Sequence, residues 1–435
     1  MHSLKKLHVH LAHDTHFYEL LRKGSTAFAL RTSGIILSFI LTLMITHQYG
    51  AVDYGNFMLT LVIIQILSIL LRLGLDNIII RDTAAAIQAN NLALAKGTAI
   101  TAQRTVLIMS LITSICLYYT APFIGTKVLN KPDMILPLTM GSLYLTPITM
   151  CYLIAQSLKG VKHIAMSSFI YSISFPLLTL LLLIGLEAFV EKSLYMLLTL
   201  YSLAIWITWW IAERHWQHVV RQTKAIKPKL RQLLNSSIPL LLASAGTMVM
   251  TWSDMIILGI YETSEHIGHY NVASKVALLT SVLLAATNAI AAPKFSELYS
   301  SGQLHALKIL VKKITRLMII LMIIPTLILF TFPHEILSTF GNGFERAAPI
   351  LTFLILGQFI NVSCGSVVFL LSMTGHEKKV RTIMLTTALI NIILNYFLIQ
   401  SHGVTGVAMA TMGSLMIWNI WMLFQVKKSL GFWMI

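Results

Sequence analysis

Charged residues are scarce in this sequence. Asp, Glu, Lys and Arg together make up 11% of the 435 residues, whereas apolar residues make up 56%. Ordinary soluble domains contain about 25% charged and roughly 45–50% apolar residues. The composition therefore excludes an ordinary soluble domain and predicts a membrane protein.

Cysteines and paired acids are scarce too. The three cysteines, Cys116, Cys151 and Cys364, all fall within apolar runs, so neither disulfides nor a cysteine metal site is expected. No Asp-x-Asp pair occurs and the outer loops are short, which argues against a membrane polymerase or glycosyltransferase. We expect no catalytic residue, no metal and no cofactor.

Long apolar runs are what the sequence does contain. Each is close to the length of about 20 residues that crosses a hydrocarbon core about 30 Å thick. The twelve runs cover residues 27–47, 57–80, 104–125, 134–157, 163–185, 194–212, 235–260, 271–293, 314–334, 347–373, 380–399 and 404–425. They predict an all-α integral membrane protein with twelve transmembrane helices.

The loops between these runs alternate in charge. Most of the 32 basic residues lie in alternate loops and in the tails, and residues 213–234 are especially basic. Lys and Arg mark cytoplasmic loops, so both termini are predicted to be cytoplasmic. This inner face explains the net charge of +16, and no nucleic-acid partner is expected. The first run is span-length and follows a polar stretch, so no cleavable signal peptide is expected.

Two short segments resemble each other. The first is "YGAVDYGNF" at residues 49–57 and the second is "YETSEHIGHY" at residues 261–270. Each has a Tyr, an acid four residues later, then a Gly and an aromatic residue. Six runs separate the copies, as in parallel repeats related by an axis along the membrane normal; chance similarity is the alternative.

The repeat predicts how the chain is divided. We expect an N-terminal tail at 1–26, a six-helix lobe at 27–212, a basic cytoplasmic linker at 213–234, a second six-helix lobe at 235–425 and a C-terminal tail at 426–435. The two lobes are predicted to enclose a central cavity. The first tail holds "HVHLAHDTH", which could bind a metal, although a polar interfacial helix is the preferred interpretation.

Three segments resemble a known family. They are "YGAVDYGNF", "LGLDNIIIRDTA" at 73–84 and "SDMIILGIYETSEHIGHYNVASKVALL" at 253–279. The chain is similar in them to the polysaccharide and O-antigen flippases of the multidrug/oligosaccharidyl-lipid/polysaccharide (MOP) exporter superfamily. The resemblance implies a transporter that moves an undecaprenyl-diphosphate-linked oligosaccharide, such as an O-antigen repeat unit, across a bacterial inner membrane by alternating access.

The resemblance also implies partners. They are the lipid-linked oligosaccharide, membrane lipid, a proton or sodium ion for coupling, and the polysaccharide polymerase with its chain-length machinery. A drug or cation exporter of the same superfamily is the main alternative. Its cavity should favour acids and aromatic residues that hold cationic drugs.

Ionisable groups at least one helical turn inside the runs are candidate site residues, because each costs about 2.5–3.5 kcal/mol on insertion scales. They are Arg31, Arg72, Asp76, Asp254 and Lys275. These three cations and two anions leave one uncompensated positive charge, which a diphosphate would neutralise. Arg in particular suits bidentate contacts with phosphate. We expect the three cations to bind substrate, and the two acids to serve gating or coupling.

Structural roles remain open for each group. Arg72 and Asp76 are four residues apart and can pair on one helix face, and Arg31 can snorkel to the interface. Asp254 and Lys275 lie at nearly the same depth in consecutive runs, so we predict an ion pair between them. That pair either is purely structural or opens to release Lys275 toward the substrate.

Overall fold

Helices dominate this chain because a bilayer offers no hydrogen-bond partner to a free backbone group. The structure, a computed structural model, describes residues 15–89, 91–186, 191–221 and 224–434, without the side chains of 15–28, 242–247, 249–251 and 289. Residues 1–14 of the histidine-rich tail lie outside the described residues. In the described ranges the chain forms helices joined by short connections.

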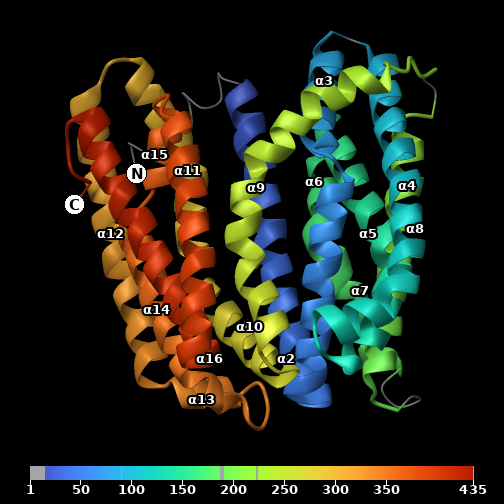
Figure 1. The fold of residues 1–435 in the computed structure, drawn as a ribbon. Helices are drawn as coiled ribbons and strands as arrows, with labels where there is room; N and C mark the ends of the chain where they lie inside the picture. Colours follow the sequence, from blue (N-terminus) through green and yellow to red (C-terminus); the bar gives the residue numbers. More distant parts are fainter. Residues whose placement is uncertain (1–14, 90, 187–190, 222–223, 435) are drawn as a thin grey trace.

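The first half of the chain contributes the helices that Figure 1 colours blue to green. They are α2 (Thr15–Leu71), α3 (Leu75–Gln88), α4 (Leu92–Phe123), η1 (Ile124–Val128), η2 (Pro132–Met134), α5 (Ile135–Gly160), α6 (Ile164–Ser168), η3 (Phe169–Ile173), α7 (Ser174–Leu186) and α8 (Leu194–Val219). All twelve apolar runs of the sequence fall in helices, apart from short breaks such as 72–74, 280–281 and 364–366.

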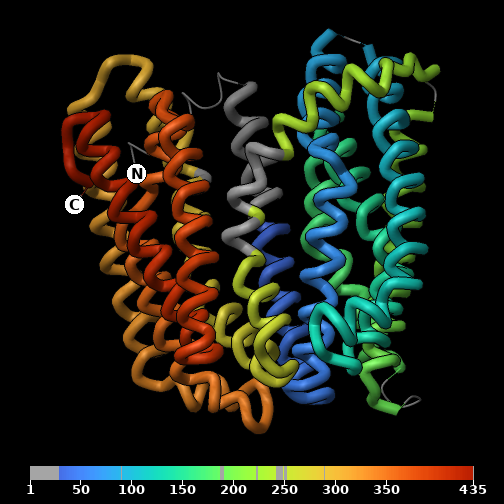
Figure 2. Tube along the Cα trace, in the orientation of Figure 1, coloured from blue at the N-terminus to red at the C-terminus, as the bar shows by residue number. Residues whose placement is uncertain are grey.

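The second half of the chain contributes the helices that Figure 1 colours yellow-green to red. Its helices are α9 (Leu230–Tyr261), α10 (Ser264–Leu279), α11 (Val282–Ser300), α12 (Leu304–Thr331), α13 (Pro333–Ser338), η4 (Phe344–Ala347), α14 (Ala348–Ser363), α15 (Val367–Met373) and α16 (Glu377–Leu430). In Figures 1 and 2, α3–α8 gather on one side and α11–α16 on the other, with α9 between them. Helix α10 packs against α2 and so joins the two groups.

The longest helix, α2, folds back on itself. Gly50 has non-helical backbone angles, with φ 74°, and Lys275 reaches both Thr42 and Tyr54. In a straight helix those two residues would lie about 18 Å apart. Residues 15–49 and 51–71 are therefore two antiparallel arms, which Figure 1 shows running down and back up.

Helix α16 folds back in the same way. Gly403 has φ 55°, and Asn395 and Thr411 both donate hydrogen bonds to Asp254, although a straight helix would separate them by about 24 Å. By length and composition, eight helices of the described chain can cross a membrane, or nine with the bent pair α10–α11. Because α2 and α16 each contain two apolar runs, this number neither confirms nor excludes the twelve expected spans.

The run predicted over 57–80 is broken. Helix α2 ends at Leu71 and α3 begins at Leu75, because Leu73 and Gly74 adopt left-handed angles with φ 51° and 73°. A positive φ is uncommon outside glycine and is strained for a branched residue such as Leu. The continuous helix expected there was therefore wrong, and the break lies beside the candidate residue Arg72.

The two copies of the sequence repeat meet at the end of the molecule that carries α13. A Cβ atom on Gly55 would lie 1.7 Å from the carbonyl oxygen of Ser264, and one on Gly268 would lie 2.3 Å from that of Ala51. Each copy thus places a glycine against the residue four positions before the other glycine. Small residues at this spacing let two helix backbones approach closely.

Candidate functional site

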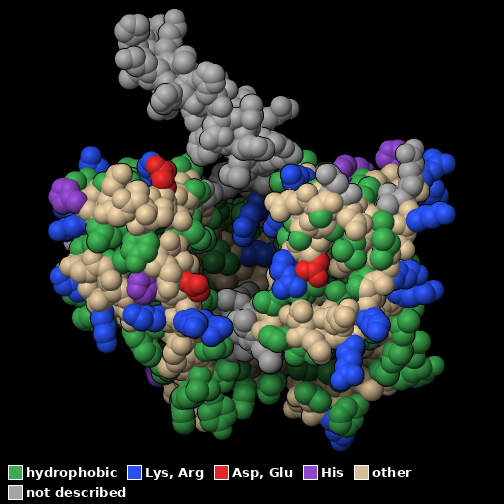
Figure 3. All heavy atoms as spheres, turned by 90° about the horizontal axis from the view of Figure 1, so that it is seen from above, with side chains coloured by type: hydrophobic (Ala, Val, Ile, Leu, Met, Phe, Trp, Pro, Cys, Tyr) green, Lys and Arg blue, Asp and Glu red, His purple; other side chains and the backbone are tan. Residues whose placement is uncertain are grey.

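A cavity of about 440 Å³ lies between the first arm of α2, η3, α10 and α11. Two cations line it, Arg31 from α2 and Lys275 from α10, together with the hydroxyls of Ser38, Tyr171 and Ser281. Figure 3, seen from the end that carries α3, shows a central hollow with Lys and Arg side chains inside it and around its rim. Two of the three predicted substrate-binding cations therefore share one cavity.

The position of Lys275 follows from helix geometry. Its ammonium group donates a hydrogen bond to Thr42 Oγ1 at 2.6 Å and lies 5.6 Å from the centre of the Tyr54 ring. Tyr54 in turn donates to Asn271 Oδ1 at 2.6 Å. Arg31, Ser38 and Thr42 recur at helical spacing, so one face of α2 holds all three beside α10.

Arg72 occupies a different place. It is 5% exposed, and its guanidinium lies 3.4 Å from Asp76 and 5.1 Å from the centre of the Tyr152 ring. Arg72 is not among the residues that line the cavity of Arg31 and Lys275. The pairing with Asp76 that the spacing allowed is thus formed, but across a break between two helices rather than along one helix.

Asp254 is the most completely hydrogen-bonded candidate. Its carboxylate is 8% exposed and accepts hydrogen bonds from Tyr270 Oη and Thr411 Oγ1 at 2.6 Å and from Asn395 Nδ2 at 2.7 Å. Asn391 extends the network, because its Oδ1 accepts from both Asn395 and Ser253. Helices α9, α10 and both arms of α16 therefore converge on one carboxylate.

The predicted ion pair between Asp254 and Lys275 was wrong for this structure. Within the described part of the chain no ion pair joins them, and Lys275 bonds Thr42 instead. The reason is that α10 begins at Ser264 and not at 271, which places Tyr270 level with Asp254. A step of five residues from Tyr270 moves Lys275 about 7.5 Å along the helix and turns its side chain by about 140°. Lys275 therefore faces α2 while Tyr270 faces α9, although depth alone placed the two charges together.

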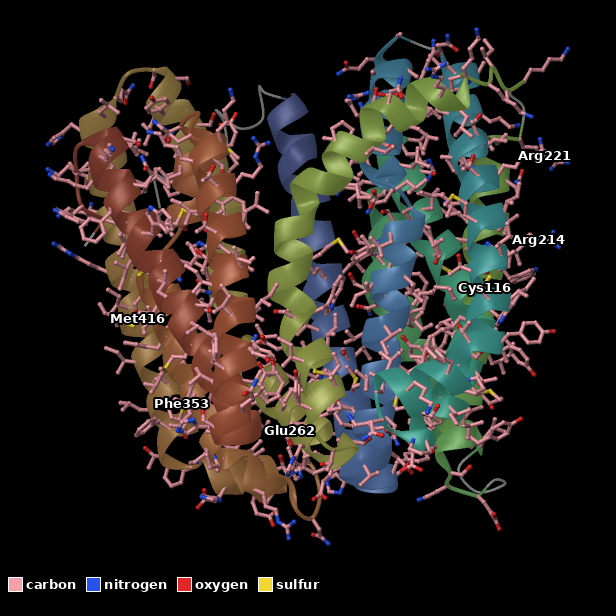
Figure 4. The ribbon with its side chains drawn as sticks, viewed as in Figure 1. Cys116, Arg214, Arg221, Glu262, Phe353 and Met416 are labelled. Atoms are coloured by element: carbon pink, nitrogen blue, oxygen red, sulfur yellow. The ribbon has the colours of Figure 1, made fainter. Side chains whose placement is uncertain are left out.

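Polar contacts also close the end opposite the hollow. Lys131, between η1 and η2, donates to the carbonyl oxygen of Gly259 at 2.6 Å, and His47 bonds the carbonyl oxygen of Thr339 at 2.6 Å. Glu262 follows α9 at this end, as Figure 4 shows. Partial burial lowers the pKa of Lys131 to about 8, and the charge of Glu262 opposes this shift.

Sequence reasoning missed several residues of both sites. Tyr171 lines the cavity, and Tyr270 and Thr411 bond Asp254. Tyrosine and threonine are common inside membrane helices, so no local pattern separates these from the others. Their partners come from helices that are distant in the sequence, and only the fold brings them together.

Two family models and a curated relative match this chain. A family model described as "Polysaccharide biosynthesis protein" matches residues 20–299, and one described as "MatE" matches residues 239–397. A probable low-salt glycan biosynthesis flippase, Agl15 of Haloferax volcanii, is 28% identical over 236 residues, which are 52% of this chain and 47% of that protein. The chain thus spans about half the length of this curated relative.

Solved structures share the fold. An inward-facing multidrug resistance transporter of the MATE family aligns with a TM-score of 0.71 at 14% identity, over 93% of this chain and 98% of that one. The lipid II flippase MurJ, in an inward closed conformation, aligns with a TM-score of 0.64 at 14% identity, over 92% and 87%. The polysaccharide biosynthesis model covers more than half of the chain, so this chain, with its several membrane-length helices and a fold shared with MOP-superfamily transporters, belongs to the polysaccharide biosynthesis protein family.

Proposed function

We propose that this protein is a flippase for an undecaprenyl-diphosphate-linked oligosaccharide, an O-antigen or similar repeat unit, in a bacterial inner membrane. The observation that carries the proposal is the cavity charge. Arg31 and Lys275 line the cavity, and no Asp or Glu is among its described lining residues. A diphosphate is the anion that suits such a site, because charge-assisted hydrogen bonds from Arg and Lys to phosphate are strong.

The proposed layout has twelve helices in two lobes, 27–212 and 235–425, with the linker 213–234 and both tails, 1–26 and 426–435, in the cytoplasm. The fold-backs at Gly50 and Gly403 support it, since each gives two antiparallel arms. The meeting of Gly55 and Gly268 supports the repeat, because the two copies contact each other reciprocally. In this layout the cavity of Arg31 and Lys275 opens toward the cytoplasm, where the substrate is made. The polymerase and chain-length proteins then act on the transported lipid outside.

Asp254 is the proposed site of ion coupling, with a proton or sodium as the ion. Its carboxylate, Thr411 and Asn395 offer oxygen atoms from three helical segments, and Asn395 Oδ1 is buried without a hydrogen-bond partner. Hard cations such as sodium prefer oxygen ligands, and a buried carboxylate can instead take up a proton. We assign gating, and not ion coupling, to Asp76, which pairs with Arg72.

The alternative function is export of cationic drugs or of another lipid-linked substrate, coupled to a cation. The match of residues 239–397 to the MatE model favours it. A cationic drug, however, would meet Arg31 and Lys275 in the cavity, and like charges repel. The flippase is therefore the better-supported function.

The test replaces each cavity cation by Glu in cells that depend on this protein for surface polysaccharide. Arg31→Glu and Lys275→Glu should abolish surface polysaccharide while the protein still reaches the membrane, and Arg31→Lys should retain part of it. Arg214→Glu is the matched control, because Arg214 lies over the exposed Trp210 ring. Normal polysaccharide in both Glu variants, or loss of drug resistance instead, would contradict the proposal.

A further inference from the structure

Tyr171 is displayed in the cavity by an unusual helical turn. It lies in η3, a π-helical turn, and its side chain is 50% exposed. Single π-helical turns inserted in α-helices often occur at functional sites. The turn is held against α2, because a Cβ on Gly34 would lie 2.4 Å from the carbonyl oxygen of Ser172. Tyr171 thus stands opposite the face of α2 that carries Arg31.

A cluster of aromatic side chains packs against the Tyr171 ring. Its centre lies 5.0 Å from that of Tyr152, which also contacts Phe175 at 5.9 Å. The guanidinium of Arg72 lies 5.1 Å from the centre of the Tyr152 ring. Arg72 itself is held by Asp76 at 3.4 Å and by the carbonyl oxygen of Ser68 at 3.3 Å. The contacts of this cluster therefore run from a buried cation, through one tyrosine, to another at the cavity wall.

The chemistry of a glycolipid suits this arrangement. In the substrate class proposed above, the first sugar is bonded directly to the diphosphate. When the two cations hold the diphosphate, that sugar lies within the same cavity. A pyranose presents an apolar face of C–H groups, which gains free energy when it covers an aromatic ring.

We propose that Tyr171 is the surface on which the first sugar of the lipid-linked oligosaccharide stacks, and that Arg72 is a positioning residue that acts through Tyr152. This inference rests on the flippase function. It replaces the expected direct contact of Arg72 with the diphosphate by an indirect role. Arg31 and Lys275 bind the charged part common to all such lipids, and Tyr171 distinguishes a lipid that carries sugar from one that does not.

The test compares two probes, undecaprenyl diphosphate and undecaprenyl diphosphate that carries one glucose, for binding to the purified full-length chain in nanodiscs. Tyr171→Ala should weaken binding of the glucose-bearing lipid about tenfold, as expected for loss of one aromatic contact, and leave binding of the bare diphosphate lipid unchanged. Tyr171→Phe and Tyr171→Trp should keep the preference for sugar. Tyr195→Ala, at an exposed tyrosine of α8, is the matched control.

The positioning role has its own readout. Arg72→Leu should reduce the preference for the sugar-bearing lipid, Arg72→Lys should restore it in part, and neither should change binding further once Tyr171 is Ala. Where Arg72→Leu does not fold, Tyr152→Leu interrupts the same series of contacts. Equal weakening of both lipids by these variants, or additive losses with Tyr171→Ala, overturns the inference. If instead Arg31→Glu leaves both lipids bound, the diphosphate site itself is wrong.

Discussion

The environment of Asp254 shows how a single carboxylate can be stable among apolar helices without a cation beside it. Three neutral donors, from Tyr270, Thr411 and Asn395, point at its two oxygens. Hydrogen bonds to a charged acceptor contribute more than neutral ones, about 1.5–3 kcal/mol each. The donors depend on the acid in return, since their own buried polar groups have no water to replace it.

This dependence predicts the effect of removing the carboxylate. Asp254→Ala should lower the unfolding temperature in detergent strongly, because each stranded donor costs about 1–3 kcal/mol. Asp254→Asn should lower it less, since the amide oxygen still accepts. The matched control is Glu297→Ala, at an exposed acid that contacts Lys294 on the surface, and it should change stability little. Equal losses for Asp254→Ala and Glu297→Ala would contradict this account.

Individual elements depend on close backbone approaches as much as on apolar surface. The turn η3 reaches α2 only because position 34 lacks a side chain. Gly34→Ala should therefore destabilise the protein by about 1–3 kcal/mol, the range for overpacking, and weaken lipid binding by displacing Tyr171. Unfolding temperature and lipid affinity are the measurements.

A control for that substitution lies in α7, where a Cβ on Gly185 would meet nothing within 4 Å. Gly185→Ala should be neutral or stabilising, because alanine is favoured over glycine in a helix by roughly 0.5–1 kcal/mol. The free energy of unfolding should therefore fall in Gly34→Ala and stay the same or rise in Gly185→Ala. Similar losses at both would mean that the approach of η3 is unimportant.

The connection between η1 and η2 gives a prediction about pH. The pKa of Lys131 is lowered from 10.5 to about 8 in the folded protein. Between these values the unfolded chain keeps the proton and the folded chain loses it, so stability rises with pH across this window. Compared with Lys131→Met, the wild type should gain unfolding temperature from pH 8 to 10. A flat difference across that range would contradict the assignment.

The helices were predictable and their breaks were not. The length of the apolar runs was enough to place all twelve within helices, because a helix satisfies its own backbone hydrogen bonds in lipid and runs of this length are too long for barrel strands. The interruption at Leu73 was missed since leucine gives no sign that it will adopt a positive φ. Asp254 and Lys275 were expected at the same depth because the run was taken to begin at 271, but α10 begins at Ser264, so Tyr270 and not Lys275 lies level with Asp254. Tyr171 was missed because a π-helical turn has no sequence signature.

At the scale of the whole molecule, the two groups of helices touch closely where the repeat copies cross. Adding a methyl group at Gly55 or Gly268 would place it within 2.3 Å of a carbonyl oxygen of the other copy. Gly55→Ala and Gly268→Ala should both part the helices at this end, and to a similar extent because the contact is reciprocal. In the proposed orientation this end lies outside, so both substitutions should increase the fraction of molecules whose cavity is open to the outside.

Thiol labelling can measure this shift. In a chain without Cys116, Cys151 and Cys364, a cysteine at the cavity residue Ser38 should resist a membrane-impermeant reagent added to whole cells. Gly55→Ala or Gly268→Ala should make it react, and Gly185→Ala should not. Continued protection in both variants, with the protein folded, would show that the crossing does not control access.

The two cavity cations come from different halves of the chain, and this affects the protein when no substrate is bound. Arg31 belongs to the first half of the chain and Lys275 to the second, yet both line one cavity. Without an anion between them, the halves carry like charges that repel each other, and the repulsion grows as the cavity narrows and water leaves it. In the proposed function, a bound diphosphate would reverse the sign of that force. The protein without substrate would then be held open, and the substrate itself would supply the attraction that draws the halves together.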